Sequence, residues 1–253
     1  MTILQSLINR SSIGQKSIAV LIDPDKHQTA KDLTRLIGLC VENKVNYLFV
    51  GGSLLTNDHT NMIISTIKNI TTTPVLLFPG SSMHLDLSAD GILLLSLISG
   101  RNPELLIGQH VLAAPIIKKS TLEVISTGYM LIGNGNDSTV SYMSNTIPIP
   151  TSKTSVAVCT AMAGEMLGLK TIYLEAGSGA AVPVPSKMIK LVKNSVSVPL
   201  IVGGGLNSPE KAIRAIQSGA DLIVLGNGIE ENPDLLIQVS EEINMINQTL
   251  DIH

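Results

Sequence analysis

The chain has 253 residues and a net charge of −3, and 44% of its residues are apolar while only 2% are aromatic. This composition excludes a disordered chain and supplies a large core of aliphatic side chains. Because the sequence has neither a basic stripe nor interleaved aromatic residues, we expect no nucleic-acid partner.

The cysteines and the longest apolar stretches indicate the cellular compartment of the protein. Cys40 and Cys159 lie far apart without CxxC spacing, which argues against a disulfide framework and a zinc site. We expect both thiols to be buried as small apolar groups. Stretches such as 92–95 are much shorter than the roughly 20 residues that span a bilayer, and residues 1–12 lack the features of a signal peptide. The sequence therefore predicts a cytoplasmic protein.

In chain order, short apolar runs alternate with longer amphipathic segments. The runs predict eight strands, at 18–22, 47–50, 75–78, 92–95, 129–132, 172–174, 200–202 and 222–225. The segments between them predict helices at 29–42, 57–70, 102–113, 155–169, 184–195, 208–218 and 232–246. Apolar runs that do not alternate with polar residues are typical of parallel strands covered on both faces. This uninterrupted alternation predicts one α/β domain over residues 1–253, a (β/α)8 TIM-type barrel, with an open doubly wound sheet as the alternative.

One connection is unusually long and polar. Residues 133–153, after the fifth predicted strand, contain the sequence IPIP at 147–150. We expect a loop here, and a lid over a site and a plain insertion are equally compatible with it.

Glycines gather where the predicted strands end. Six of the eight strand ends carry Gly, and the carboxyl ends of barrel strands form the active-site face. The turns at Gly203-Gly204 and Gly226-Asn227 follow the last two strands, where barrels often bind phosphate through backbone N–H groups. The turn Gly177-Ser178-Gly179 adds further donors. Tight strand-to-helix turns are the other explanation, but two such motifs in consecutive units favour a phosphate site.

Two acidic residues end the first strand. Asp23 and Asp25 flank Pro24, and Ser53 ends the neighbouring second strand. Their oxygens could bind Mg²⁺ directly or through water. Each could instead cap the helix that follows, which is the commoner role of such residues.

Glu175 is the other carboxylate at a strand end. Close to a phosphate site it could accept a hydroxyl proton or bind a polyol, or it could anchor a loop. Tyr173 lies two residues earlier and therefore on the same face of the strand, either in the barrel mouth or in the core. The histidines, His27, His59, His84, His110 and His253, show no HxH or HExxH spacing, and we interpret them as surface or loop residues.

These motifs, taken together, resemble one enzyme family. LIDPDK at 21–26, GGS at 51–53, YLEAGSG at 173–179, IVGGGL at 201–206 and GADLIVLGNGI at 219–229 are similar in order and spacing to the geranylgeranylglyceryl phosphate synthase family. The GGGL and GNGI motifs occur in many phosphate-binding barrels, whereas LIDPDK with GGS and YLEAGSG is much more specific. The form YLEAGSG resembles the second group of the family, which has archaeal and bacterial members.

The resemblance implies a Mg²⁺-dependent prenyltransferase. It would join the C3 hydroxyl of sn-glycerol 1-phosphate to C1 of a polyprenyl diphosphate, such as the geranylgeranyl compound, and release diphosphate. Carried over by motif, Asp23 and Ser53 hold Mg²⁺, and Glu175 and Tyr173 are catalytic. The glycerol phosphate site then consists of Tyr173, Leu174, Glu175, Ala176, Gly177, Ser178, Gly179, Gly203, Gly204, Gly226 and Asn227.

The chain departs from the family at one position. First-group members have a Lys where this chain has Leu21, so Lys26 could compensate.

The prenyl transfer that the resemblance implies also leads to several expectations about the donor and about assembly. Apolar residues of strands two to four and the adjoining helices are expected to line the prenyl groove. With only two Phe and four Tyr to block that groove, the composition favours a long donor. We also expect a homo-oligomer and transient membrane contact through the lipid product.

Two other classes of protein remain as alternatives. One is a different phosphate-binding barrel enzyme, such as a sugar-phosphate isomerase or an aldolase. A Schiff-base aldolase needs a Lys at an inner strand end, and no predicted strand carries one. The other is a non-catalytic binder of phosphate ligands.

Overall fold

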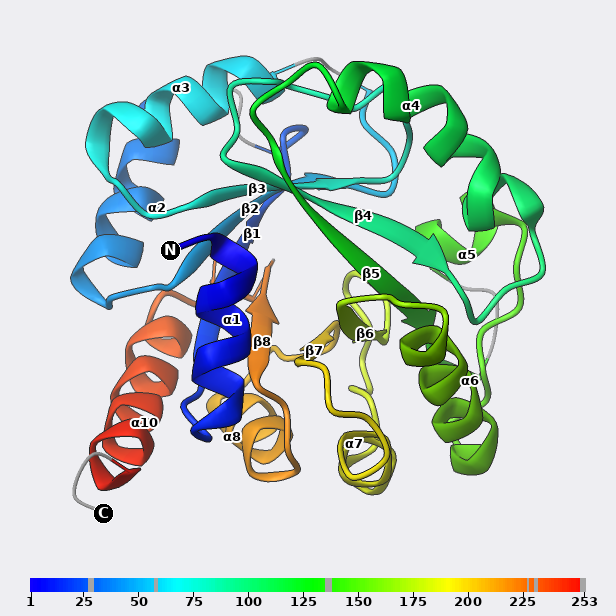
Figure 1. Cartoon of the computed structure of the whole chain (residues 1–253). Coiled ribbons are helices and arrows are strands. Elements are labelled where there is room, and N and C mark those ends of the chain that lie inside the picture. Colours follow the sequence, from blue (N-terminus) through cyan, green and yellow to red (C-terminus); the bar gives the residue numbers. More distant parts are fainter. Residues whose placement is uncertain (27–29, 57–58, 135–137, 227, 230–231, 251–253) are drawn as a thin grey trace.

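Eight parallel strands close into a barrel at the centre of the molecule (Figure 1), in the order β1 to β8 with β8 pairing back to β1. This computed structural model describes residues 1–26, 30–56, 59–134, 138–226, 228–229 and 232–250. The strands are β1 Ser17–Ile22, β2 Tyr47–Gly52, β3 Val75–Pro79, β4 Gly91–Leu97, β5 Glu123–Leu131, β6 Thr171–Glu175, β7 Leu200–Gly203 and β8 Leu222–Leu225. The predicted TIM-type barrel is confirmed, and the open sheet is wrong.

Helices surround the barrel (Figure 1), except at the connection from β3 to β4. They are α1 Ile3–Ser12, α2 Ala30–Glu42, α3 Thr60–Ile70, the π-helix η1 Glu104–Gly108, α4 Gln109–Ile117, α5 Thr139–Ser144, α6 Thr154–Met166, α7 Ser186–Lys193, α8 Pro209–Gln217 and α10 Asp234–Leu250. Residues 80–90, which connect β3 to β4, are all described and contain no helix. The predicted alternation without interruption is therefore wrong at this point. Among the described helices, none has the length and apolar character needed to cross a membrane.

Both faces of the barrel strands are buried, which explains why the strands read as continuous apolar runs. In β2, Tyr47 and Phe49 belong to the cluster inside the barrel, while Leu48 and Val50 pack in the layer between strands and helices. Successive side chains of a strand point to opposite faces, so apolar residues are favoured at both the odd and the even positions.

The fifth strand begins at Glu123, well before the predicted start at Tyr129. Polar residues in its first half hide it from a search for apolar runs. Thr127 is fully buried, but its hydroxyl donates to the carbonyl of Ile125 and accepts a hydrogen bond of 2.9 Å from Thr171 of β6. Mutual hydrogen bonding removes the cost of burying these hydroxyls. The connection after β5, expected to be a loop, contains the short helix α5.

Helix α1 closes the amino-terminal end of the barrel. Its Leu7 is buried in the cluster inside the barrel. The Glu123 carboxylate accepts hydrogen bonds from the backbone N–H groups of Ile3, at 2.6 Å, and Leu4, at 2.7 Å. A carboxylate at a helix amino terminus satisfies unpaired donors and matches the helix dipole.

We predict that Glu123→Ala lowers the free energy of unfolding by about 1–2 kcal/mol, because two N–H groups of α1 lose their acceptor. Urea denaturation measures the change. The control, Glu241→Gln on the exposed side of α10, should leave the stability unchanged. A Glu123→Ala variant as stable as the parent would show that α1 does not depend on this contact.

Candidate active site

Strand β6 directs two polar side chains into the barrel. Tyr173 and Glu175 alternate with Leu174, and Tyr173 belongs to the cluster inside the barrel. Leu174 is fully buried in the outer layer against the helices. The strand therefore points the Leu174 side chain away from the barrel mouth, and the place of Leu174 in the ligand site stays a prediction.

Glu175 is a buried carboxyl group held by the turn that follows β6. Only 7% of its surface is exposed, and its Oε1 accepts a hydrogen bond of 2.6 Å from the N–H of Gly177. Burial raises the pKa of Glu175 to about 7, although the Gly177 N–H and the Tyr173 hydroxyl favour the ionised form. A carboxyl group with a pKa near neutrality can accept a proton at physiological pH.

Tyr173 lies beneath Glu175 in an aromatic cluster inside the barrel. Its side chain is fully buried, and its ring lies 5.2 Å from Tyr129 and 5.5 Å from Phe78, which in turn stacks on Phe49 at 6.2 Å. The Tyr173 hydroxyl has no hydrogen bond of good geometry to a described atom, yet it faces the Glu175 carboxylate closely enough to influence its ionisation. Tyr173 is placed to orient Glu175, and its predicted contact with a ligand stays a prediction.

The glycine-rich turns after β6 and β7 meet around the Glu175 carboxylate. A β-carbon at Gly203 would overlap the Tyr173 hydroxyl, and one at Gly204 would overlap Glu175 Oε1. Gly204 also has a φ of +79°, and its missing β-carbon would lie 2.7 Å from the amide nitrogens of Ala176 and Gly177. Two backbone turns can approach so closely only without side chains.

The remaining residues expected to bind phosphate surround these turns. Ser178 and Gly179 are exposed at the tip of the turn after β6, and Gly226 directly follows β8. Gly228 packs against Asn207, which links the turn after β8 to the turn after β7. Asn227 lies outside the described residues.

Asp23 and Asp25 have different surroundings. Asp23 follows β1 and faces the end of β2, with its Oδ1 3.6 Å from the position that a β-carbon of Gly52 would take. The Asp25 carboxylate accepts hydrogen bonds from the backbone N–H of Thr56, at 2.8 Å, and from its hydroxyl, at 3.0 Å. Asp25 thus joins two loops. Lys26 is exposed in the same turn.

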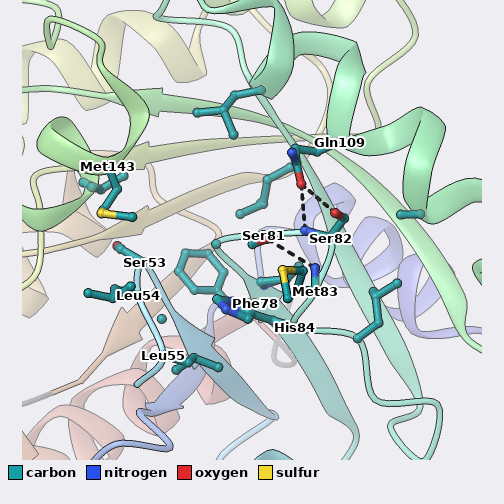
Figure 2. A pocket seen from close by; sticks show the side chains of 18 of the residues that line it. Ser53, Leu54, Leu55, Phe78, Ser81, Ser82, Met83, His84, Gln109 and Met143 are labelled. Atoms are coloured by element: carbon teal, nitrogen blue, oxygen red, sulfur yellow. Dashed lines mark hydrogen bonds between the residues drawn. The ribbon is translucent and has the colours of Figure 1, made fainter. Parts of the chain in front are cut away.

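Ser53, the other predicted metal residue, lies at the edge of a large pocket. It directly follows β2 beside the loop after β3, and it lines the pocket together with the following residues of both loops (Figure 2). Asp23 and Ser53 therefore lie on neighbouring strand ends, as expected. Within the described ranges, no group of three or more His, Cys, Asp or Glu side chains is arranged to hold a metal ion.

The pocket has a volume of about 810 Å³ and a mostly apolar wall. It begins at the barrel mouth, where Phe78 and Tyr129 line it, and continues between β4 and α4, where Leu94 and Ala113 line it. It lies beside the connection that lacks a helix. Because Phe78 and Tyr129 also contact Tyr173, the pocket adjoins the Glu175 site.

Sequence reasoning missed three residues of this site and misplaced one cysteine. Tyr129, His84 and His110 line the pocket. The histidines were expected as surface or loop residues, and His84 does lie in the loop between β3 and β4, whereas His110 lies on α4. Tyr129 could have been found from its register, since it pairs with Tyr173 across β5 and β6. No local sequence pattern marks His110 as a pocket residue, because its hydrogen-bond partner Ser96 lies on another element. Cys40 is buried as expected, but Cys159 is exposed on α6.

A buried carboxyl group among glycine-rich turns at the carboxyl end of a (β/α)8 barrel is typical of phosphate-ligand enzymes of the TIM-barrel class. The PcrB family model matches residues 12–244. The chain therefore belongs to the PcrB family.

Relatives and solved structures agree with this assignment. Geranylgeranylglyceryl phosphate synthase from Spirosoma linguale is 52% identical over 237 residues, covering 94% of this chain and 95% of that protein. The enzyme of the same name from the archaeon Korarchaeum cryptofilum is 41% identical, covering 88% and 91%. The structure of the Thermoplasma acidophilum synthase, solved with sn-glycerol-1-phosphate bound, matches with a TM-score of 0.89 and 30% identity, covering 96% and 98%.

We predict that Gly204→Ala displaces Glu175 and reduces activity at least about tenfold, while lowering stability by about 1–3 kcal/mol. The control, Gly168→Ala, has a similarly positive φ of +90° but open space around the new methyl group. It should lose about 1 kcal/mol and keep its activity. Equal activity losses in both variants would contradict the close approach of Gly204 and Glu175.

We also predict that Glu175→Gln stabilises the fold at alkaline pH. Since the pKa of Glu175 is raised from 4.5 to about 7 in the folded state, the stability supplied by its protonated form is complete below pH 4.5 and lost as pH rises through about 7. The neutral variant should exceed the parent by about 1–3 kcal/mol at pH 8 and match it near pH 4.5. Urea denaturation at both pH values checks this, and Glu241→Gln should show no such pH-dependent gain.

Proposed function

We propose that the chain is a Mg²⁺-dependent prenyltransferase. It transfers a geranylgeranyl group from its diphosphate to the C3 hydroxyl of sn-glycerol 1-phosphate and releases diphosphate. The names of its relatives and the sn-glycerol-1-phosphate bound to the Thermoplasma acidophilum enzyme support this assignment.

One observation carries the proposal. A carboxyl group with a pKa of about 7 adjoins both a set of glycine-rich turns and an apolar pocket of about 810 Å³. The turns suit a small phosphate, and the pocket suits a long hydrocarbon chain. The aromatic contacts between Tyr173, Tyr129 and Phe78 support a position of Glu175 close to the junction of the two.

The reaction follows from this junction. The oxygen of the C3 hydroxyl bonds to C1 of the prenyl group as the bond from C1 to the diphosphate oxygen breaks. Glu175 accepts the hydroxyl proton as the ether forms, and diphosphate leaves with the electron pair of the broken bond. Tyr173 and the Gly177 N–H hold the carboxylate in place, and the apolar walls keep water from C1.

The residues expected at the metal site fit Mg²⁺. Asp23 and Ser53 offer a carboxylate and a hydroxyl on adjacent strand ends, and Ser53 lines the pocket. Mg²⁺ prefers such oxygen ligands and commonly binds one or two carboxylates together with substrate phosphates. When bound there, it would neutralise the charge that develops on the leaving diphosphate.

The alternatives find less support. The eight described strands contain no Lys, so none supplies the inner-strand amine of a Schiff-base aldolase. A non-catalytic binder would not need a buried carboxyl group whose pKa lies close to neutrality. The cytoplasmic location, the homo-oligomer and the transient membrane contact stay predictions, as does the preference for a long donor.

The test is to incubate the protein with Mg²⁺, labelled sn-glycerol 1-phosphate and prenyl diphosphates of several lengths, and to extract the lipid phosphate. Glu175→Gln should reduce kcat by about 10²- to 10⁴-fold, since it removes the base. Asp23→Asn should lose Mg²⁺-dependent turnover, while Glu241→Gln should behave like the parent. Absence of product with every donor, while a known synthase works in parallel, would refute the proposal.

The pH dependence provides a separate test. We predict that kcat/KM rises about tenfold per pH unit below pH 7 and levels off above it, because Glu175 must be ionised to accept the proton. The residual activity of Glu175→Gln should lack this rise. A parent profile that is flat from pH 5 to pH 8 would remove Glu175 from the role of base.

A further inference from the structure

Helix α4 forms the outer wall of the pocket but is only loosely packed on the barrel. Ala113 and Ile117 are its buried residues, whereas Val111 and Leu112 are more than 60% exposed. The space between α4 and the outer face of β4 belongs to the pocket. The helix therefore lacks the continuous packed face that holds an ordinary barrel helix in position.

Apolar contacts alone would not fix the position of this helix. Residues 105–117 carry no charge, so apolar side chains point in all directions around it. Hydrophobic contacts are non-directional, whereas hydrogen bonds demand a distance and an angle. The position of α4 must then depend on its polar contacts.

Two pairs of polar side chains connect α4 to the barrel, and we call them the anchor pairs. Gln109 Oε1 accepts hydrogen bonds from the Ser82 backbone N–H, at 3.0 Å, and from the Ser82 hydroxyl, at 2.6 Å (Figure 2). His110 Nε2 lies 3.1 Å from the Ser96 hydroxyl. Ser82 belongs to the connection without a helix and Ser96 to β4, so the anchor pairs tie α4 to both sides of the pocket.

The chemistry of the anchor pairs suits an apolar pocket. Burial lowers the pKa of His110, so its imidazole is neutral at physiological pH. Gln109 is neutral as well, and both side chains lie in the pocket wall. Placing a charge beside a hydrocarbon chain costs free energy, because the charge loses its hydration. Neutral anchor pairs fix the helix without this cost.

We propose that Gln109 and His110 are positioning residues for the prenyl chain, because they fix the helix that forms the outer wall of its groove. The inference rests on the proposed function, which supplies the prenyl donor. Binding is tighter when the wall is already in place before the ligand arrives. Loss of an anchor pair should therefore weaken donor binding and leave the glycerol phosphate site, on the far side of Tyr129, unchanged.

The experiment measures KM for both substrates in Gln109→Leu and His110→Leu. Each variant loses one anchor pair, so KM for geranylgeranyl diphosphate should rise about three- to tenfold, while KM for sn-glycerol 1-phosphate stays constant. Dimethylallyl diphosphate, whose chain is too short to reach α4, should show a smaller rise. Gln217→Leu, an exposed change of the same kind at the end of α8, is the matched control.

Each outcome decides the proposal. An unchanged donor KM, or an equal rise for both substrates, would overturn it. If the parent makes no product, the proposed function fails, and amide hydrogen exchange then decides the anchoring on its own. Faster exchange of residues 109–117 in both Leu variants, with α10 unchanged, supports the anchor pairs, and unchanged exchange overturns them.

Discussion

The burial of one carboxyl group, that of Glu175, governs the arrangement of the site. Removing this group from water costs free energy unless neighbours stabilise it, and the chain supplies few. One backbone N–H donates to it and one phenol faces it. The two glycine-rich turns must come close to enclose it, which requires Gly203 and Gly204 to lack side chains. The same turns present the backbone to a phosphate, so one constraint shapes both the base and the ligand site.

A second constraint arises from the barrel itself. Parallel strands need apolar cover on their outer face, and a helix normally provides it. Between β3 and β4 the chain crosses without a helix, and α4 covers β4 with only two buried side chains. The uncovered outer face becomes the wall of the apolar pocket. What would be a packing defect in an ordinary barrel is here the space in which a hydrocarbon chain can lie.

Much of this architecture follows from local sequence, because strands buried on both faces read as unbroken runs of Ile, Leu and Val. The limits of β8 and the shared strand face of Tyr173 and Glu175 needed nothing more than this pattern and its two-residue period. The first half of β5 could not be predicted in this way, because the buried hydroxyl of Thr127 is stabilised by a hydrogen bond from a residue 44 positions away. His110 was missed for the same reason, because its meaning depends on Ser96 across the pocket. Contacts between distant residues leave no local pattern.

The aromatic cluster gives the molecule a built-in optical probe. The chain has no Trp and four Tyr, and two of these, Tyr129 and Tyr173, pack against each other beside Glu175. Half of the fluorophores thus report on the surroundings of one carboxyl group. Because a neighbouring carboxylate alters phenol emission, the ionisation of Glu175 and the arrival of a ligand become visible in the intrinsic ultraviolet signal, without any label.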